Sequence, residues 1–372
     1  MNSVANLHGK KTIYTEARRS HDPTVIHPIR KTRVFAALSA FIAVILLSGC
    51  VSAKREPELQ LYEAIQPHMG TLVTISLYAP DKVAADNAAT AAFARIAELN
   101  MILSDYEEES ELRRLVREPV GMPVKISDDL MTVLSHSRDL SKKTDGAFDV
   151  TMGPIIRFWR RARRQRTLPD PARLAQVRSA VGYEKLKLDP RRGTATLLAT
   201  NMFIDLGGIA KGYAADEALV TLRKLGISRA LVAASGDIRA GDPPPGEKGW
   251  NVGIASIDAV NGELTDRTLL KNAAVSTSGD TEQNVLIDGV RYSHIVDPET
   301  GHGLRKRIGV TVVARDAMTT DSLATAISVL GAEKGLKLIE SFPGTAAMIV
   351  EVTDEKTTRV TSRGYLELPR PK

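Results

Sequence analysis

The amino-acid sequence predicts an α+β fold, in which mixed or antiparallel sheets pack against helices. In the second half of the chain, several segments with the composition of strands follow one another without a helix between them. This order argues against a regularly alternating parallel sheet. Other segments carry apolar residues at helical spacing. The 372-residue chain is long enough for one large or two medium domains with a real core.

The first expected elements are a strand at 71–78, TLVTISLY, and a long Ala-rich helix at 81–103. Further helices are predicted at 128–143, 171–181, 209–224, 320–330 and 333–340. Further strands are predicted at 202–205, 230–233, 250–257, 274–276, 308–314 and 346–351.

The segment from Arg30 to Cys50, RKTRVFAALSAFIAVILLSGC, has the layout of a secretory signal peptide. Its apolar run is shorter than the roughly 20 residues that cross a bilayer, so a permanent transmembrane anchor is the weaker alternative. The run ends in Leu-Ser-Gly-Cys, which resembles the lipobox of bacterial lipoproteins. Cys50 is the only cysteine in the sequence and cannot form an internal disulfide. We therefore predict lipidation of Cys50.

These features predict three regions: a lipoprotein signal peptide with a long n-region at 1–49, a lipid-anchored tether at 50–62 and a domain at 63–368. The expected location is the periplasm-facing side of a membrane. Val51 follows the lipidated cysteine where an Asp would favour the inner membrane, so the outer membrane is the favoured destination.

The net charge of +6 comes mostly from the leader. Residues 1–50 contain seven Lys/Arg and two Asp/Glu, which leaves 43 basic and 42 acidic residues in the remainder. A nearly neutral mature chain argues against nucleic acid as a partner.

The densest motif is DLGGIAKGYAAD, Asp205 to Asp216, where an apolar run turns into a helical pattern. Gly207 and Gly208 allow the backbone to approach a ligand closely. The following helix presents amide groups and the positive end of its dipole to an anion, and Lys211 adds a full charge. The spacing is neither that of a Walker A loop nor G-x-G-x-x-G. A purely structural turn is the alternative.

A second motif is TTDSLATAISVLG, 319–331, in which Thr320 is expected to cap a helix. Asp321 and Thr325 stand four residues apart, so their oxygens share one helical face. Two such ligands suit Mg²⁺, which keeps water and substrate phosphate in the rest of its shell. Alternatively, the helix dipole alone favours an Asp in the first turn.

A third motif is RYSHIVDPETGHG, 291–303, with His294 at the end of an expected strand. A histidine suits proton transfer near neutrality, although a structural role is the alternative. Two weaker signals are HMGT at 68–71 and DGAFDVTMGPIIRFW at 145–159. The run RFWRRARRQR, 157–166, carries six arginines and reads as a solvated helix face or a contact with acidic lipid or protein, ahead of a phosphate-binding role.

Together with AVSTSGD at 274–280, these segments in this order resemble the ApbE family of FAD:protein FMN transferases, over roughly residues 63–367. The resemblance implies a single catalytic unit of two lobes that takes FAD as substrate, uses Mg²⁺, and attaches FMN to a threonine of a target protein with release of AMP. One departure is ASGD at 234–237, where many members carry a glycine pair before Asp or Asn, so the backbone path there is expected to differ.

The resemblance also implies site residues. His294 would activate the acceptor hydroxyl. The metal ligands would be Asp321, Thr325 and the backbone carbonyl of Gly208. The implied FAD contacts are Met69, Tyr106, Ala147, Phe148, Asp149, Asp205, Lys211 and Ile295.

The expected partners are FMN-acceptor subunits of membrane redox complexes, of the Rnf type or the sodium-translocating NADH:quinone reductase type. Two other functions stay open at this point. A periplasmic FAD pyrophosphatase would use water as the acceptor and yield FMN and AMP. A non-enzymatic FAD-binding lipoprotein would store or present the flavin.

Overall fold

The computed structural model describes residues 27–28, 58–255, 264–279, 283–353 and 356–371. Cys50 and most of the predicted signal peptide and tether lie outside these residues. Among the helices that the structure describes, none has the length and apolar character needed to span a bilayer.

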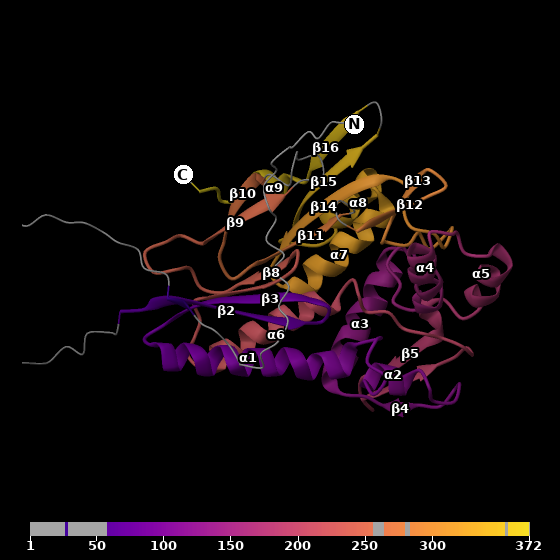
Figure 1. Ribbon diagram of the computed structural model, residues 1–372, viewed down its shortest axis with the longest axis horizontal. Coiled ribbons are helices and arrows are strands. Elements are labelled where there is room, and N and C mark those ends of the chain that lie inside the picture. Colours follow the sequence, from indigo (N-terminus) through magenta and orange to yellow (C-terminus); the bar gives the residue numbers. More distant parts are fainter. Residues whose placement is uncertain (1–26, 29–57, 256–263, 280–282, 354–355, 372) are drawn as a thin grey trace, which may run out of the picture.

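A nine-stranded sheet runs through the centre of the molecule, in the order β1-β2-β3-β7-β8-β11-β14-β15-β16 (Figure 1). All of its pairings are antiparallel, which confirms the predicted α+β class. Its strands are β1 (His27–Pro28), β2 (Gln60–His68), β3 (Thr71–Ala79), β7 (Ala230–Ala234), β8 (Asp237–Ala240), β11 (Ala274–Gly279), β14 (Arg307–Ala314), β15 (Ala346–Val352) and β16 (Thr357–Thr361).

Three small antiparallel sheets accompany the large one. They are β4 (Val124–Lys125) with β6 (Thr194–Leu197) and β5 (Leu186–Asp189), β9 (Trp250–Ala255) with β10 (Leu264–Leu270), and β12 (Asn284–Ile287) with β13 (Val290–Ser293). The pair β9–β10 packs with α9 (Arg363–Leu366) over one face of the large sheet, around Trp250 and Tyr365.

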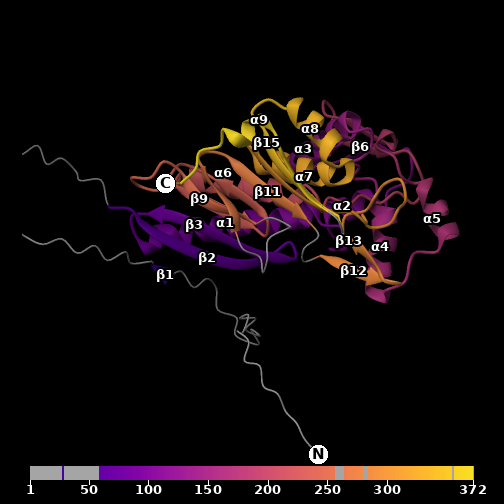
Figure 2. The same cartoon turned by 90° about the horizontal axis from the view of Figure 1, so that it is seen from above.

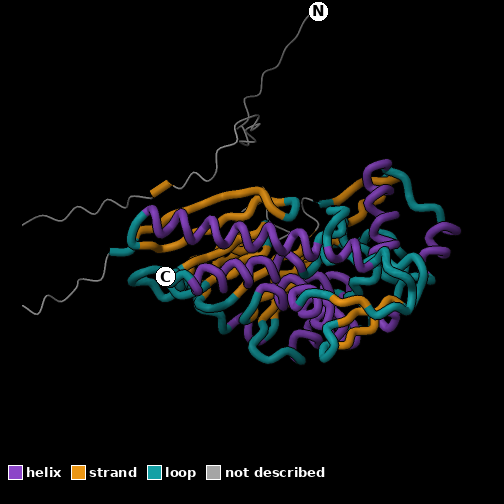
Figure 3. The backbone as a smooth tube through the Cα atoms, turned by 90° about the horizontal axis from the view of Figure 1, so that it is seen from below, coloured by secondary structure: helices purple, strands orange, loops and turns teal. Residues whose placement is uncertain are grey.

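The main core lies between the other face of the large sheet and three helices, α1 (Lys82–Leu103), α6 (Ala210–Lys224) and α7 (Ala317–Leu330). Figure 3 shows α1 and α6 side by side. Alanines fill most of the buried positions of α1, so the helix can approach its neighbours closely. Asp81 caps α1 by accepting a hydrogen bond from the Ala84 backbone N–H.

The remaining helices gather mostly beyond the C-terminal end of α1 (Figures 1 and 2). They are α2 (Glu111–Leu115), α3 (Asp128–Lys143), α4 (Gly153–Gln165) and α5 (Pro171–Arg178), with the 3-10 turn Tyr183–Lys185. Helix α8 (Ala332–Glu340) instead follows α7 and packs on β15. A separate apolar cluster joins α4 and α5 to the β12–β13 hairpin through Trp159 and Tyr292.

Several predicted boundaries were wrong. The segment 202–205 forms no strand. Its Phe203 makes an isolated parallel bridge with Met152, the residue just before α4, and this pairing does not extend into a ladder. Helix α7 begins at Ala317 with Asp316 as its cap, so Thr320 lies inside the helix. Strand β2 begins at Gln60, within the range predicted as tether. Helix α4 and the strands β4 to β6 were not predicted, because their apolar residues are few.

Candidate functional site

The N-terminal turn of α6 packs directly on α7. A Cβ atom at Gly212 would lie 2.1 Å from the carbonyl oxygen of Ala317, so only glycine permits this approach. The backbone N–H of Gly212 donates a hydrogen bond of 3.1 Å to Oδ2 of Asp321. The DLGGIAKG turn and the Asp321 helix, which are more than 100 residues apart in sequence, are therefore in contact.

Asp321 is a buried carboxylate in a group that holds more negative than positive charge. Its side chain is 4% exposed, and Lys211 Nζ lies 3.5 Å from its Oδ2 and 2.9 Å from Oδ2 of Asp237 on β8. Burial, reinforced by the charge of Asp237, raises the pKa of Asp321 to about 7. One ammonium thus serves two carboxylates, and a bound cation would supply the missing positive charge.

Gly208 and Thr325 complete a set of oxygen donors beside Asp321. A Cβ atom at Gly208 would lie 2.8 Å from Oγ1 of Thr325, so any larger residue would fill the space between the turn and the helix. A carboxylate, a hydroxyl and a backbone carbonyl are the hard oxygen ligands that Mg²⁺ accepts. No group of three or more His, Cys, Asp or Glu side chains arranged for a metal occurs within the described ranges. Asp321, Thr325 and the Gly208 carbonyl are too few to fill a Mg²⁺ shell, so they fit a Mg²⁺ that takes its other ligands from substrate and water.

Asp205, at the start of the same glycine turn, pairs with an arginine of α4. Nη2 of Arg160 lies 2.5 Å from Oδ2 of Asp205, and its Nη1 pairs with Asp105. The same guanidinium lies 4.5 Å from the centre of the Tyr106 ring. The Gly207 backbone N–H donates to Oδ1 of Asp205 at 2.9 Å, which holds the glycine turn in place. Tyr106 is 71% exposed and offers an open aromatic face beside these charges.

The predicted contacts Ala147, Phe148 and Asp149 lie close to Asp205 in the structure. The backbone N–H of Asp205 donates to the carbonyl of Val150, the residue that follows this segment, at 2.8 Å. Phe148 is buried in the main core, and its backbone N–H donates to the hydroxyl of Thr144 at 3.2 Å. Burial raises the pKa of Asp149, whose Oδ1 accepts from the Thr151 hydroxyl at 2.7 Å.

Met69 occupies the β2–β3 turn with a positive φ of 48° and packs against the main core. No hydrogen bond or ion pair given for the described residues joins its side chain to the other predicted contacts. Its part in the site therefore depends on packing alone.

His294 follows β13 and is held by the backbone of Gln283. Its Nδ1 lies 3.3 Å from the Gln283 carbonyl oxygen, which also accepts the His294 backbone N–H at 2.9 Å. If Nδ1 donates to that carbonyl, Nε2 is left as a proton acceptor. Burial, with the charges of Arg163 and Lys211, lowers the pKa of His294 to about 4. The neighbouring Ile295 is buried and donates its N–H to the Ser293 hydroxyl at 3.1 Å.

The sequence-based interpretation missed three contributors to this region. The first is Asp105, which stands next to Tyr106. The second is Asp237, in the ASGD segment that departs from the family pattern and in which Ser235 adopts a φ of 60°. The third is Arg160, because the arginines of 157–166 are expected from the sequence to lie on a solvated helix face. The buried Trp159 and Ala162 on the same helix were the available signal that part of this run faces inward.

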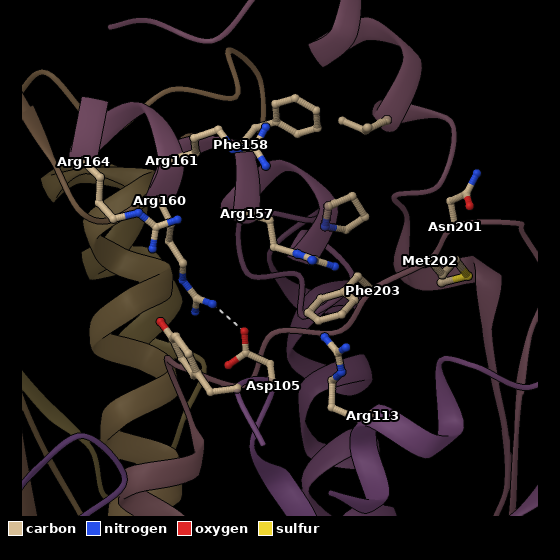
Figure 4. Close-up of a pocket in the computed structure, with 13 residues that line it drawn as sticks. Asp105, Arg113, Arg157, Phe158, Arg160, Arg161, Arg164, Asn201, Met202 and Phe203 are labelled. Atoms are coloured by element: carbon tan, nitrogen blue, oxygen red, sulfur yellow. Dashed lines mark hydrogen bonds and ion pairs between the residues drawn. The ribbon is translucent and has the colours of Figure 1, made fainter. Parts of the chain in front are cut away.

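A pocket of about 560 Å³ adjoins Tyr106 and Arg160 (Figure 4). Its walls come from α4, the segment after α1, and the segment before the glycine turn. It is lined by Asp105, Tyr106, Arg113, Pro154, Arg157, Phe158, Arg160, Arg161, Arg164, Val177, Asn201, Met202 and Phe203.

Comparisons with known proteins agree on one class. The ApbE family model matches residues 69–349. A protein of Haemophilus influenzae named FAD:protein FMN transferase is 31% identical over 284 residues, which is 74% of this chain and 82% of that protein. A protein of the same name from Vibrio cholerae is 30% identical and covers 85% of this chain and 94% of its own length.

Solved structures show the same similarity. The flavin transferase ApbE from Vibrio cholerae superimposes with a TM-score of 0.75 at 28% identity, over 84% of this chain and 100% of that one. The ApbE protein of Thermotoga maritima gives 0.74 at 30% identity, over 84% and 100%. The relatives and the solved structures are thus proteins named as flavin transferases or as members of the ApbE family. The chain belongs to the ApbE family.

Proposed function

We propose that this protein is a Mg²⁺-dependent FAD:protein FMN transferase, which moves FMN from FAD to a threonine hydroxyl of a target protein. The observation that carries the proposal is the contact of the α6 glycine turn with Asp321 and Thr325 in a chain of the ApbE family. In this proposal an anion-binding helix terminus, a lysine and a cation site would lie next to one another, which the contact between Gly212 and Asp321 supports. Cleavage of a pyrophosphate needs these three features.

The residues of the chain would divide the work as follows. The N-terminal turn of α6 and Lys211 would bind the pyrophosphate, while Tyr106, Met69 and Ile295 would contact the rest of FAD. Ala147, Phe148 and Asp149 would approach FAD through the loop after α3, with Asp205 held in place by Arg160. Asp321, Thr325 and the Gly208 carbonyl would hold Mg²⁺, which when bound neutralises charge on the phosphate oxygens.

His294 would take the proton of the acceptor hydroxyl on Nε2. The threonine oxygen then forms a bond to the FMN phosphorus, and the bond from that phosphorus to the bridging oxygen breaks. The bridging oxygen leaves with the electron pair as part of AMP, and the proton passes from His294 to solvent. A pKa of about 4 keeps the His294 ring neutral at physiological pH, and it makes the ring a weaker base than an ordinary histidine.

The test uses residues 51–372 with FAD, MgCl₂ and an FMN-acceptor domain. A fluorescent acceptor band that survives denaturation, with one AMP per flavin, supports the proposal. Replacing Asp321 by Asn should abolish the band, and EDTA should do the same to the wild type. AMP release at an equal rate without acceptor would make the protein an FAD pyrophosphatase. FAD binding without AMP release under any metal condition would make it a flavin-binding lipoprotein.

The proposal extends to location and partners. Lipidation of Cys50 after removal of residues 1–49 would tether the enzyme to a periplasm-facing membrane, with the outer membrane favoured. Acceptors would be subunits of Rnf-type or sodium-translocating NADH:quinone reductase complexes. A Cys50→Ser variant should leave the membrane fraction while its isolated domain keeps its activity. Membrane retention of that variant would refute the lipid anchor.

A further inference from the structure

An arginine-rich pocket adjoins the candidate FAD site, and most of its arginines have no part in the proposed transfer chemistry. Five arginines line it, with Asp105 as the single carboxylate among its thirteen lining residues. Phe158, Phe203 and Pro154 supply apolar surface between these charges. The combination of guanidinium groups with aromatic rings is typical of a surface that binds acidic groups of a partner.

The regular spacing of arginines in α4 puts four of them on one side of the helix. Arg157 stands three residues before Arg160 and four before Arg161, and Arg164 stands four after Arg160 and three after Arg161, so the four side chains form one stripe. The opposite side of the helix carries buried residues such as Trp159. The stripe is therefore a defined face of a packed helix.

Within the described residues, Arg160 is the one arginine of the stripe whose charge is balanced by carboxylates. Arg160 pairs with Asp105 and Asp205. In the part of the chain that the structure describes, Arg157, Arg161 and Arg164 form no ion pair with a carboxylate. Like charges at this spacing repel one another, and an anionic partner would relieve that repulsion.

Arg113 of α2 adds a second signal from another element. Among the described residues its buried Nε has no hydrogen-bond partner, which is costly for a buried polar atom. Its guanidinium carbon lies 4.9 Å from the centre of the Phe203 ring, and that of Arg157 lies 4.4 Å from the same centre. Figure 4 shows Phe203 between the two. The Phe203 ring thus contacts two guanidinium groups, one from α2 and one from α4, at the wall of the pocket.

We infer that this pocket docks an acidic segment of the protein acceptor beside the active site. The inference rests on the proposed function, because that function requires an acceptor at this mouth of the molecule. Arg160 and Tyr106 belong to both the pocket and the candidate FAD site. A carboxylate bound by Arg157 and Arg161 would therefore stand next to the place where a threonine hydroxyl must arrive.

The position of the pocket favours a protein segment over a bilayer. Asp105 and Tyr106 follow the C-terminal end of α1, whereas β2 begins at the opposite end of that helix (Figures 1 and 2). A helix of 22 residues is about 33 Å long. A chain anchored ahead of β2 thus enters the fold far from the arginines, and a membrane covering them would exclude the acceptor.

The experiment compares Arg157→Glu/Arg161→Glu with the wild type and with Arg166→Glu. Arg166 is an exposed arginine of the same run that does not line the pocket. Charge reversal in the pocket should raise the KM for the acceptor domain at least about tenfold, because the loss of a charge pair in a sheltered site weakens binding by such a factor. It should leave FAD affinity, acceptor-free AMP release and Tm unchanged. Arg166→Glu should leave every value unchanged.

A peptide arm tests the pocket without any catalysis. A hexapeptide of alternating Asp and Glu should bind the wild type in calorimetry, and the matching Asn/Gln peptide and the double variant should show no binding. An unchanged KM together with equal binding of both peptides would overturn the inference. Loss of FAD affinity in the double variant would assign the pocket to FAD. Weaker binding to phosphatidylglycerol vesicles at an unchanged KM would assign it to lipid. If the wild type transfers no FMN, the proposed function fails. The calorimetric comparison of the two peptides then tests the pocket by itself.

Discussion

At the scale of single residues, the candidate site depends on two glycines with different tasks. Gly208 leaves room beside the hydroxyl of Thr325, while Gly212 lets the backbone of α6 touch the backbone of α7. A methyl group at Gly208 meets a side chain, and a methyl group at Gly212 meets a carbonyl oxygen that cannot move alone. The two substitutions should therefore separate activity from stability.

Gly208→Ala should lower Mg²⁺-dependent AMP formation at least about tenfold while changing the free energy of unfolding by less than about 1 kcal/mol. Gly212→Ala should lower the free energy of unfolding by about 2 kcal/mol, because overpacking costs more than the roughly 1 kcal/mol gained in helix propensity. Activity assays and urea unfolding of both variants check the pair. Full activity of Gly208→Ala would show that Mg²⁺ binds elsewhere.

His294 should titrate far below an ordinary histidine. Its lowered pKa means that the folded protein resists a proton which the unfolded chain accepts near 6.5. The contribution of this histidine to stability is therefore present at neutral pH and is lost as the pH falls from about 6.5 towards 4. NMR titration, with His294→Gln to assign the signal, should give a midpoint near 4. A midpoint above 6 would mean that the ring is solvated.

At the scale of elements, α7 carries Asp321 and Thr325 and is held by its neighbour α6. Asp216 of α6 accepts hydrogen bonds from the backbone N–H groups of Ala317 and Met318, each at 2.9 Å, and lies 2.8 Å from Nε of Arg239. A carboxylate from outside the helix thus binds the first turn of α7, where the helix dipole favours negative charge. Asp216 thus holds the N-terminal turn of the helix that carries Asp321.

Asp216→Ala should lower the free energy of unfolding by about 2–4 kcal/mol, because it removes a helix cap and leaves Arg239 buried without its partner. Adding Arg239→Met should recover part of the loss, since no unpaired charge then remains. Urea unfolding of the single and double variants measures both values. A loss below 1 kcal/mol for the single variant would contradict this role.

At the scale of the whole molecule, the large sheet makes one folding unit from segments far apart in sequence. Strand β2 covers the edge of β3, and β3 in turn pairs with β7, which is more than 150 residues later in the chain. Buried Tyr62 and Ala64 belong to β2 and to the main core. Among the residues that the structure describes, β2 is therefore the first strand whose side chains belong to the main core.

A chain that begins at residue 58 should unfold with the same Tm as one that begins at residue 51. A chain that begins at residue 70 lacks β2, exposes the edge of β3 and uncovers core side chains, so it should aggregate or unfold at a much lower temperature. Circular dichroism melting of the three chains checks this expectation. Equal melting temperatures would show that β2 is dispensable.

Local patterns in the sequence determined much of this protein. Hydrophobic periodicity predicted the α+β class and the helices at 128–143 and 209–224 closely, since burial of one face is a local property. The segments DLGGIAKGYA, STSGD and YSHIVDP, together with the Asp321/Thr325 helix, carried the resemblance to the ApbE family, because they are specific as a set.

Only the tertiary structure decided which charges meet. The pairs Lys211–Asp237, Arg160–Asp205 and Arg239–Asp216 join different elements, and no spacing in the sequence specifies them. The same holds for the arginines of α4, whose run looks solvated until packing of the opposite side turns the stripe into a pocket wall. The position of a charge depends on how the sheets and helices close on one another, and that closure is set by contacts distant in the chain.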